Sequence, residues 1–128
     1  METGAMVADS SVFIEYLRAK DKSKTTLYSI ADNPEIYVSS ITIYELHMGA
    51  SSPEKKNDIQ LLTGDLIVLP FSNEDALKAA SIYHQLKKEN SLIEFRDIFI
   101  ASTCLVNHLP IKTTNKKHFI RIKGLKIL

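Results

Sequence analysis

Three acidic residues, Asp9, Glu45 and Asp97, stand at the starts of predicted helices. If these helix starts converge on one edge of a parallel sheet, the three carboxylates lie close enough for their repulsion to raise a pKa or to require a cation. Mg²⁺ and Mn²⁺ take hard oxygen ligands, and a bound ion can activate a water and neutralise charge on a phosphate. The three acids therefore predict a site for a divalent metal ion.

Each acid also has a local explanation that needs no metal. Asp9 is a favoured helix N-cap, although the two serines that follow it could cap the same helix without a charge. Glu45 lies three residues after Thr42, which is the spacing of a capping box. A carboxylate at Asp97 is favoured by the dipole of its helix. The sequence alone leaves both explanations open, because one carboxylate can serve as cap and as ligand.

Short apolar runs alternate with segments of helical periodicity. Strands are predicted at residues 6–8, 36–39, 66–71, 110–114 and 125–128. Helices are predicted over residues 11–19, about 22–32, from Thr42, after the Ser-Ser-Pro turn, from Ser72, and from Asp97 to about His108. Strands separated by helices pair in parallel through right-handed crossovers, which predicts a three-layer α/β/α sandwich. Ligands of such sheets gather at the carboxyl ends of the strands.

The loop "TTNKKHF" after the fourth predicted strand is expected at the same edge. Thr114 and Asn115 can hydrogen-bond a metal-bound water, and His118 can contact a phosphate or be a surface or capping residue. The last 17 residues hold six of the sixteen Lys and Arg residues and no acid. Lys116 and Lys117 are therefore candidates for phosphate binding, although solvated lysines beside a strand give the same pattern.

The composition indicates one compact domain. The chain has 128 residues, of which 45% are hydrophobic and 24% charged. Its apolar runs are far shorter than the roughly 20 residues of a membrane helix, and its first residues lack an apolar secretory core, so we expect a cytoplasmic protein. Cys104 is the one cysteine, and its apolar neighbours predict a buried thiol.

Motifs of other α/β enzymes are absent from the sequence. There is no GxxxxGK[ST] nucleotide loop, no GxGxxG and no GxSxG, and the four histidines form no HExxH zinc site. A net charge of +1 does not by itself indicate a nucleic-acid binder. These absences exclude the common enzyme classes that use an α/β sheet of this size, but they do not prove nuclease chemistry.

The order and spacing of the segments resemble the PIN-domain family, and within it the small VapC-type toxins of prokaryotic toxin–antitoxin pairs. "VADSSVFIEYL" is similar to that family's opening strand with its first acid, and "SSITIYELHMGA" to its second. "RDIFIASTCLVNHLPIKTTNKKHF" resembles its third acid and closing strand, and "IKGLKIL" its final strand. The resemblance implies a PIN-like fold with a five-stranded parallel sheet of order 3-2-1-4-5.

The resemblance also implies a Mg²⁺- or Mn²⁺-dependent endoribonuclease that forms a homodimer and is neutralised by a small antitoxin. By position, Asp9, Glu45 and Asp97 would be the acidic metal ligands. Many members have a fourth acid in the last loop, where this chain has Asn115, which implies one ion until RNA phosphates complete a second site. Asn115 joins the acids as a candidate catalytic residue. The candidate substrate-binding residues are Ser10, Thr114, Lys116, Lys117 and His118.

Residues 6–128 are expected to form one PIN-like domain. Residues 1–5, "METGA", are expected to be an N-terminal extension, of vector origin or from an alternative initiation site. Two other functions stay open on the sequence. One is a catalytically weak PIN-fold module that mainly binds an antitoxin, suggested by Asn115; the other is a structure-specific DNA nuclease that uses the same acids. The small chain argues against the DNA nuclease, because little of it is left to grip a branched duplex.

Overall fold

A parallel sheet lies at the centre of the molecule. The computed structural model describes residues 4–128, and in that part four strands pair in the order β3-β2-β1-β4. They are β1 (Met6–Ala8), β2 (Ile36–Ser39), β3 (Ile67–Leu69) and β4 (Ile111–Lys112). Val7 stands in register with Tyr37 of β2 and with Ile111 of β4, which places β1 inside the sheet.

The strand predicted at residues 125–128 is reduced to one parallel bridge between Ile111 and Ile127. Two backbone hydrogen bonds of 2.9 Å hold it, from the Ile111 N–H to Lys126 and from the Leu128 N–H to Ile111. Because β4 is only two residues long, it offers too few partners for a longer ladder. The prediction of a full fifth strand is therefore wrong, but the segment lies beside β4 as the predicted order requires.

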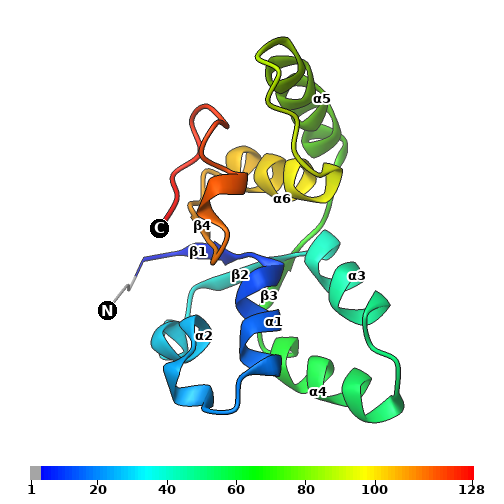
Figure 1. Cartoon of the computed structure of the whole chain (residues 1–128), viewed down its shortest axis with the longest axis vertical. Helices are drawn as coiled ribbons and strands as arrows, with labels where there is room; N and C mark the ends of the chain where they lie inside the picture. The colour runs from blue at the N-terminus through cyan, green and yellow to red at the C-terminus, as the bar shows by residue number, and fades with distance from the viewer. Residues whose placement is uncertain (1–3) are drawn as a thin grey trace.

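Helices cover both faces of the sheet. They are α1 (Ser10–Arg18), α2 (Thr26–Ile30), α3 (Ser40–Met48), α4 (Pro53–Thr63), α5 (Asn73–Lys88) and α6 (Phe95–Val106), with short 3-10 helices η1 (Lys22–Lys24) and η2 (Lys116–His118). Figure 1 shows α5 and α6 on one side of the strands and α1, α2 and α4 on the other. The predicted three-layer α/β/α sandwich is confirmed.

Neighbouring residues of β1 enter different hydrophobic cores. Val7 packs in a cluster with Ile98 of α6 and with Phe119. Met6 and Ala8 belong to a second cluster, which α1 to α4 complete. Successive side chains of a strand point to opposite faces, so an inner strand that is apolar throughout serves both cores. This burial on both sides fixes the end of β1 and therefore the position of the residue that follows it.

Helix α3 begins earlier than the sequence predicts. Ser39, at the end of β2, accepts a hydrogen bond from the Ile41 N–H and so caps a helix that starts at Ser40. Thr42 is fully buried within this helix, and Glu45 lies beyond its first turn. The predicted capping box of Thr42 and Glu45 is wrong, because Ser39 is the N-cap and accepts from the free Ile41 N–H at the start of the helix.

Helix α6 is anchored to α5 through a buried carboxylate. Ser72 caps α5 as predicted, accepting from the N–H of Asp75. The buried Asp75 carboxylate accepts a hydrogen bond of 2.7 Å from the Thr103 hydroxyl of α6. Cys104, on the same helix, is buried as predicted, and this burial raises the pKa of its thiol. The anchored helix gives the residues of its first turn a fixed position.

Three expectations concern parts of the chain away from the sheet. The segment at about 22–32 forms η1 and α2 rather than one helix, because Thr25 caps α2 by accepting from the Tyr28 N–H. The predicted N-terminal extension lies mostly outside the described residues, which start at Gly4. Within residues 4–128, no helix combines the length and the apolar character needed to cross a bilayer.

Candidate active site

Asp9 follows β1 and stands at the N-cap position of α1, but its side chain makes no capping hydrogen bond. Its Oδ2 instead accepts from the hydroxyls of Ser11 and Thr113, each at 2.8 Å. The residue is only 3% exposed, and within residues 4–128 no hydrogen bond reaches its Oδ1. A buried carboxylate oxygen without a donor is costly unless a cation or a water meets it. Capping therefore does not explain Asp9.

Glu45 extends from α3, and protein groups engage both of its carboxylate oxygens. The Ser10 hydroxyl donates to Oε1 at 2.7 Å. The Nη1 atom of Arg96 lies 3.4 Å from Oε2. Ser10 follows Asp9 in the chain and Arg96 precedes Asp97, so a direct neighbour of each of the other two acids holds Glu45.

Asp97 is the third residue of α6 and contacts His118, whose Nδ1 lies 3.2 Å from Asp97 Oδ2. Burial raises the pKa of Asp97 from 3.8 to about 6, and the charges of Asp9 and Glu45 add to the rise. The charge and hydrogen bond of His118 oppose it. Asp97 thus lies near enough to both other acids for their charges to act on its carboxyl group.

The loop after β4 completes the site. Thr113 is buried; it donates to Asp9 and accepts from the Asn115 N–H at 2.9 Å. The Thr114 N–H donates to the Ser11 hydroxyl at 3.0 Å. These bonds place four exposed residues beside the acids. They are Thr114, Asn115, Lys116 and Lys117.

The sequence matches the family model of the PIN domain over residues 6–125. The chain belongs to the PIN domain family. It is 31% identical to Ribonuclease VapC1 of Methanocaldococcus jannaschii over 128 residues, which cover 98% of this chain and 88% of that protein. These matches confirm the family resemblance.

Solved structures of VapBC proteins have the same fold as this PIN domain. VapBC-1 from nontypeable Haemophilus influenzae superposes with a TM-score of 0.83 at 26% identity, covering 98% of this chain and 97% of the other. VapBC-5 from Mycobacterium tuberculosis, described as a member of the VapBC family of toxin–antitoxin systems, superposes at 0.72 with 21% identity, covering 97% of each chain. The second likeness concerns the fold alone.

The acidic side chains of this PIN domain are of the type that binds a hard divalent cation, although they are not already arranged around one. In residues 4–128 no group of three or more His, Cys, Asp or Glu side chains is arranged to hold a metal ion. A cation would, however, meet the free Oδ1 of Asp9 and would offset the repulsion that raises the pKa of Asp97. Glu45 would need to turn away from Arg96, or share its charge, to join the other two acids.

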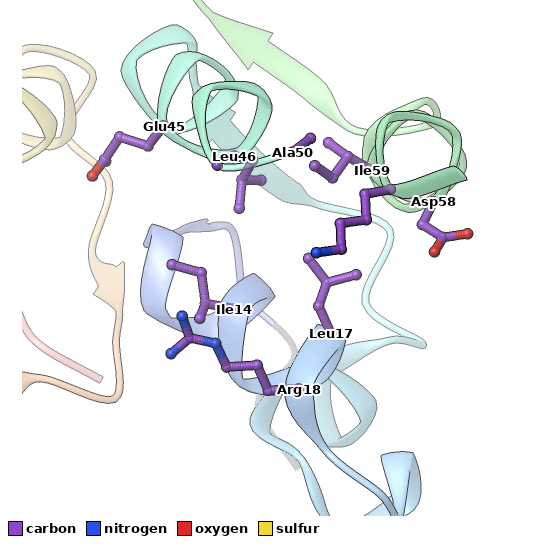
Figure 2. A pocket seen from close by; sticks show the side chains of 10 residues that line it. Ile14, Leu17, Arg18, Glu45, Leu46, Ala50, Asp58 and Ile59 are labelled. Atoms are coloured by element: carbon purple, nitrogen blue, oxygen red, sulfur yellow. The ribbon is translucent and has the colours of Figure 1, made fainter. Parts of the chain in front are cut away.

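A groove between α1, α3 and α4 leads to Glu45. It encloses about 390 Å³. Figure 2 shows Ile14 and Leu17 of α1 facing Leu46 and Ile59 across it, with Glu45 at one end. Charged side chains of α1 and α4 line the groove as well. The sequence did not predict this feature, because three separate helices form it.

Three residues of the site were not singled out from the sequence. Ser11 and Thr113 lie 102 positions apart in the chain, yet both hold Asp9. Arg96 lies 51 positions after Glu45 in the chain, yet the two side chains form an ion pair. Thr113 carried a weak signal, because it lies near the carboxyl end of a predicted strand, but no sequence pattern marks Ser11 or Arg96 as part of a site.

Proposed function

We propose that this chain is a metal-dependent endoribonuclease and the toxin of a toxin–antitoxin pair. The observation that carries the proposal is the meeting of Asp9, Glu45 and Asp97 in one site, where burial and the charges of the other two acids raise the pKa of Asp97. Such a cluster of repelling carboxylates is a place for a cation. The match to a protein named Ribonuclease VapC1, over 98% of this chain, supports RNA as the substrate.

Asp9 and Asp97 would hold a Mg²⁺ or Mn²⁺ ion, with Glu45 as a third ligand. When bound, the ion supplies charge neutralisation at the scissile phosphate and lowers the pKa of a water. Ser11 and Thr113 keep the Asp9 carboxylate in one orientation by donating to Oδ2, which leaves Oδ1 for the ion. In-line attack by a water on the scissile phosphate is expected to leave a 5′-phosphate and a 3′-hydroxyl.

The exposed loop after β4 would bind the RNA strand. Lys116 and Lys117 can pair with backbone phosphates, which makes binding dependent on salt. Thr114 and Asn115 offer neutral polar groups to a water or to a phosphate oxygen. His118 contacts Asp97 through Nδ1, so Nε2 is the ring nitrogen left for a phosphate. Ser10 already donates to Glu45 and serves mainly to orient it.

Cleavage of RNA and DNA substrates tests this function against its two alternatives. The purified protein is expected to cut structured RNA in millimolar Mn²⁺ and to leave it intact in EDTA, while DNA flaps are cut more slowly. Flaps cut at least as fast as RNA would support the DNA nuclease. RNA that stays intact with every metal ion would support the module that only binds a partner.

The groove beside Glu45 suits the proposed antitoxin. Its apolar side chains, such as Leu17 and Leu46, can pack against a peptide segment, and its charged side chains can pair with the segment's polar groups. An occupant that reaches the end of the groove would lie against Glu45 and hinder the acids. The likeness to the solved structure of VapBC-1, at 26% identity, supports a protein partner.

We also propose a homodimer formed through α5 and α6. Leu77 of α5 and Phe95 of α6 are 67% and 62% exposed. Phe95 also lines a cavity of about 530 Å³ between the two helices, together with apolar side chains that include Phe71, Tyr83 and Phe99. Exposed apolar patches of this kind mark interaction surfaces.

Leu77→Glu is expected to convert the dimer into a monomer, because a charge would be buried in the interface. Light scattering after gel filtration would then report the 14.4 kDa of one chain instead of twice that mass. Leu61→Glu is the matched control, since Leu61 is 74% exposed on α4, and it should stay dimeric. If the wild type were still monomeric at about 100 µM, its dissociation constant would be too high for a specific dimer. That result would contradict the proposal.

A further inference from the structure

The ion pair between Arg96 and Glu45 has no role in the chemistry proposed above. Arg96 Nη1 lies 3.4 Å from Glu45 Oε2, and the Ser10 hydroxyl donates to Oε1 at 2.7 Å. Both oxygens of Glu45 are therefore engaged before any metal ion arrives. Since Arg96 lies in the first turn of α6, the pair joins α3 to the helix that carries Asp97.

Stabilisation of the fold is a weak explanation for this pair. The Arg96 side chain is 45% exposed, whereas that of Glu45 is 16% exposed. Ion pairs with a half-exposed partner contribute little to stability, because water screens them and both side chains lose freedom. The guanidinium carries a positive charge, which acts on Glu45, one of the three acids of the site.

We infer that Arg96 is an internal counter-cation that holds Glu45 in the metal-free protein and competes with the divalent ion for it. The inference rests on the proposed metal site. An ion that takes Glu45 as a ligand must displace the guanidinium or lie near it, and the repulsion between the two cations weakens metal binding. Arg96 is thus a positioning residue, which sets the metal affinity through Glu45.

Binding of Mn²⁺ alone, without RNA, tests the inference. Electron paramagnetic resonance of free Mn²⁺ gives the dissociation constant for each variant. Arg96→Gln is expected to bind Mn²⁺ about three- to tenfold more tightly than the wild type, because one nearby positive charge is removed. Arg96→Lys keeps the charge and should stay near the wild type. The matched control is Arg121→Gln, which removes an exposed arginine of the C-terminal segment and should leave the affinity unchanged.

Melting temperatures separate this role from a structural one. In EDTA, Arg96→Gln should melt only slightly below the wild type, because Glu45 loses a half-exposed counter-charge, and added Mn²⁺ should raise its melting temperature by more than that of the wild type. A purely structural role would lower the melting temperature equally in EDTA and in Mn²⁺. In a Glu45→Gln background, Arg96→Gln should tighten Mn²⁺ binding by much less, because the competition for Glu45 is already gone and only the direct repulsion between the two cations is left to remove.

The outcomes distinguish this inference from the proposed function. If Arg96→Gln binds Mn²⁺ equally or more weakly, the counter-cation role is overturned, while RNA cleavage by the wild type keeps the proposed function. If the wild type itself binds no Mn²⁺, both are overturned. Tightening of the same size in the Glu45→Gln background would also overturn the inference, since Arg96 would then act without Glu45.

Discussion

Replacing Asp97 by Asn is expected to slow RNA cleavage in millimolar Mn²⁺ by at least about 100-fold, because a charged ligand contributes several kcal/mol to metal catalysis. Asn has nearly the shape of Asp, and its side-chain amide can still form a hydrogen bond with His118. The change therefore removes a negative charge and leaves the surrounding loop in place. Gel analysis of a 5′-labelled RNA at saturating protein measures the rate.

Glu94→Gln is the matched control for this prediction. Glu94 also stands at the start of α6, at the N-cap position, and its side chain makes no capping hydrogen bond. It is exposed and lines the same pocket as Asp97 and His118, but within residues 4–128 no hydrogen bond or ion pair joins its side chain to theirs, so its neutralisation should leave the rate within about twofold. Cleavage by Asp97→Asn at more than a tenth of the wild-type rate would remove Asp97 from the catalytic site. An equal loss in Glu94→Gln would point to a general effect of charge.

The position of Asp9 could be predicted from the sequence because its cause is local. Three apolar residues, Met6, Val7 and Ala8, form a buried strand, and the residue after a buried parallel strand lies at the ligand-binding edge of the sheet. The sequence also offered serines as caps, which made a charged residue at that position unnecessary for the helix. The structure agrees, since Asp9 bonds to Ser11 and Thr113 rather than capping α1.

The local explanation that competed with a metal-binding role for Glu45 is wrong. The spacing from Thr42 fits a capping box, but Ser39 caps the helix, and the choice between two nearby caps depends on where β2 ends. That end is set by pairing with β1 and β3, which a local pattern does not contain. Arg96 was missed for a related reason, because its contact with Glu45 requires α3 and α6 to pack together.

The metal-free protein is expected to lose stability as the pH rises from about 4 to about 7, and Asp97→Asn should lose less. Asp97 has a pKa of about 6 in the folded chain against 3.8 as its ordinary value. The folded state therefore holds this proton more tightly than the unfolded state, so the carboxyl favours folding at low pH and disfavours it once ionised. At about pH 8 in EDTA, Asp97→Asn should be more stable than the wild type by about 1 kcal/mol, allowing for partial exposure of the carboxyl.

Divalent metal should reverse this order. If millimolar Mn²⁺ exceeds the dissociation constant about 100-fold, it adds about 2.7 kcal/mol to the stability of the wild type. Asp97→Asn lacks one ligand and should gain much less. Thermal melting at about pH 8 should show the variant above the wild type by about 3–5 °C in EDTA and below it in Mn²⁺.

This reversal of the order of melting temperatures between EDTA and Mn²⁺ distinguishes a shared acidic site from three separate acids. A helix-dipole role for Asp97 alone predicts that Asn lowers the melting temperature slightly in EDTA, because an anion is favoured in the first turn of α6. The burial of Asp97 and the repulsion that Asp9 and Glu45 exert on it predict the opposite sign. A lower melting temperature for Asp97→Asn in EDTA, with no effect of Mn²⁺ on the wild type, would therefore contradict the cluster. The shift in EDTA thus tests whether an ionised Asp97 destabilises the metal-free protein, and its reversal in Mn²⁺ tests the metal site, both before any RNA is added.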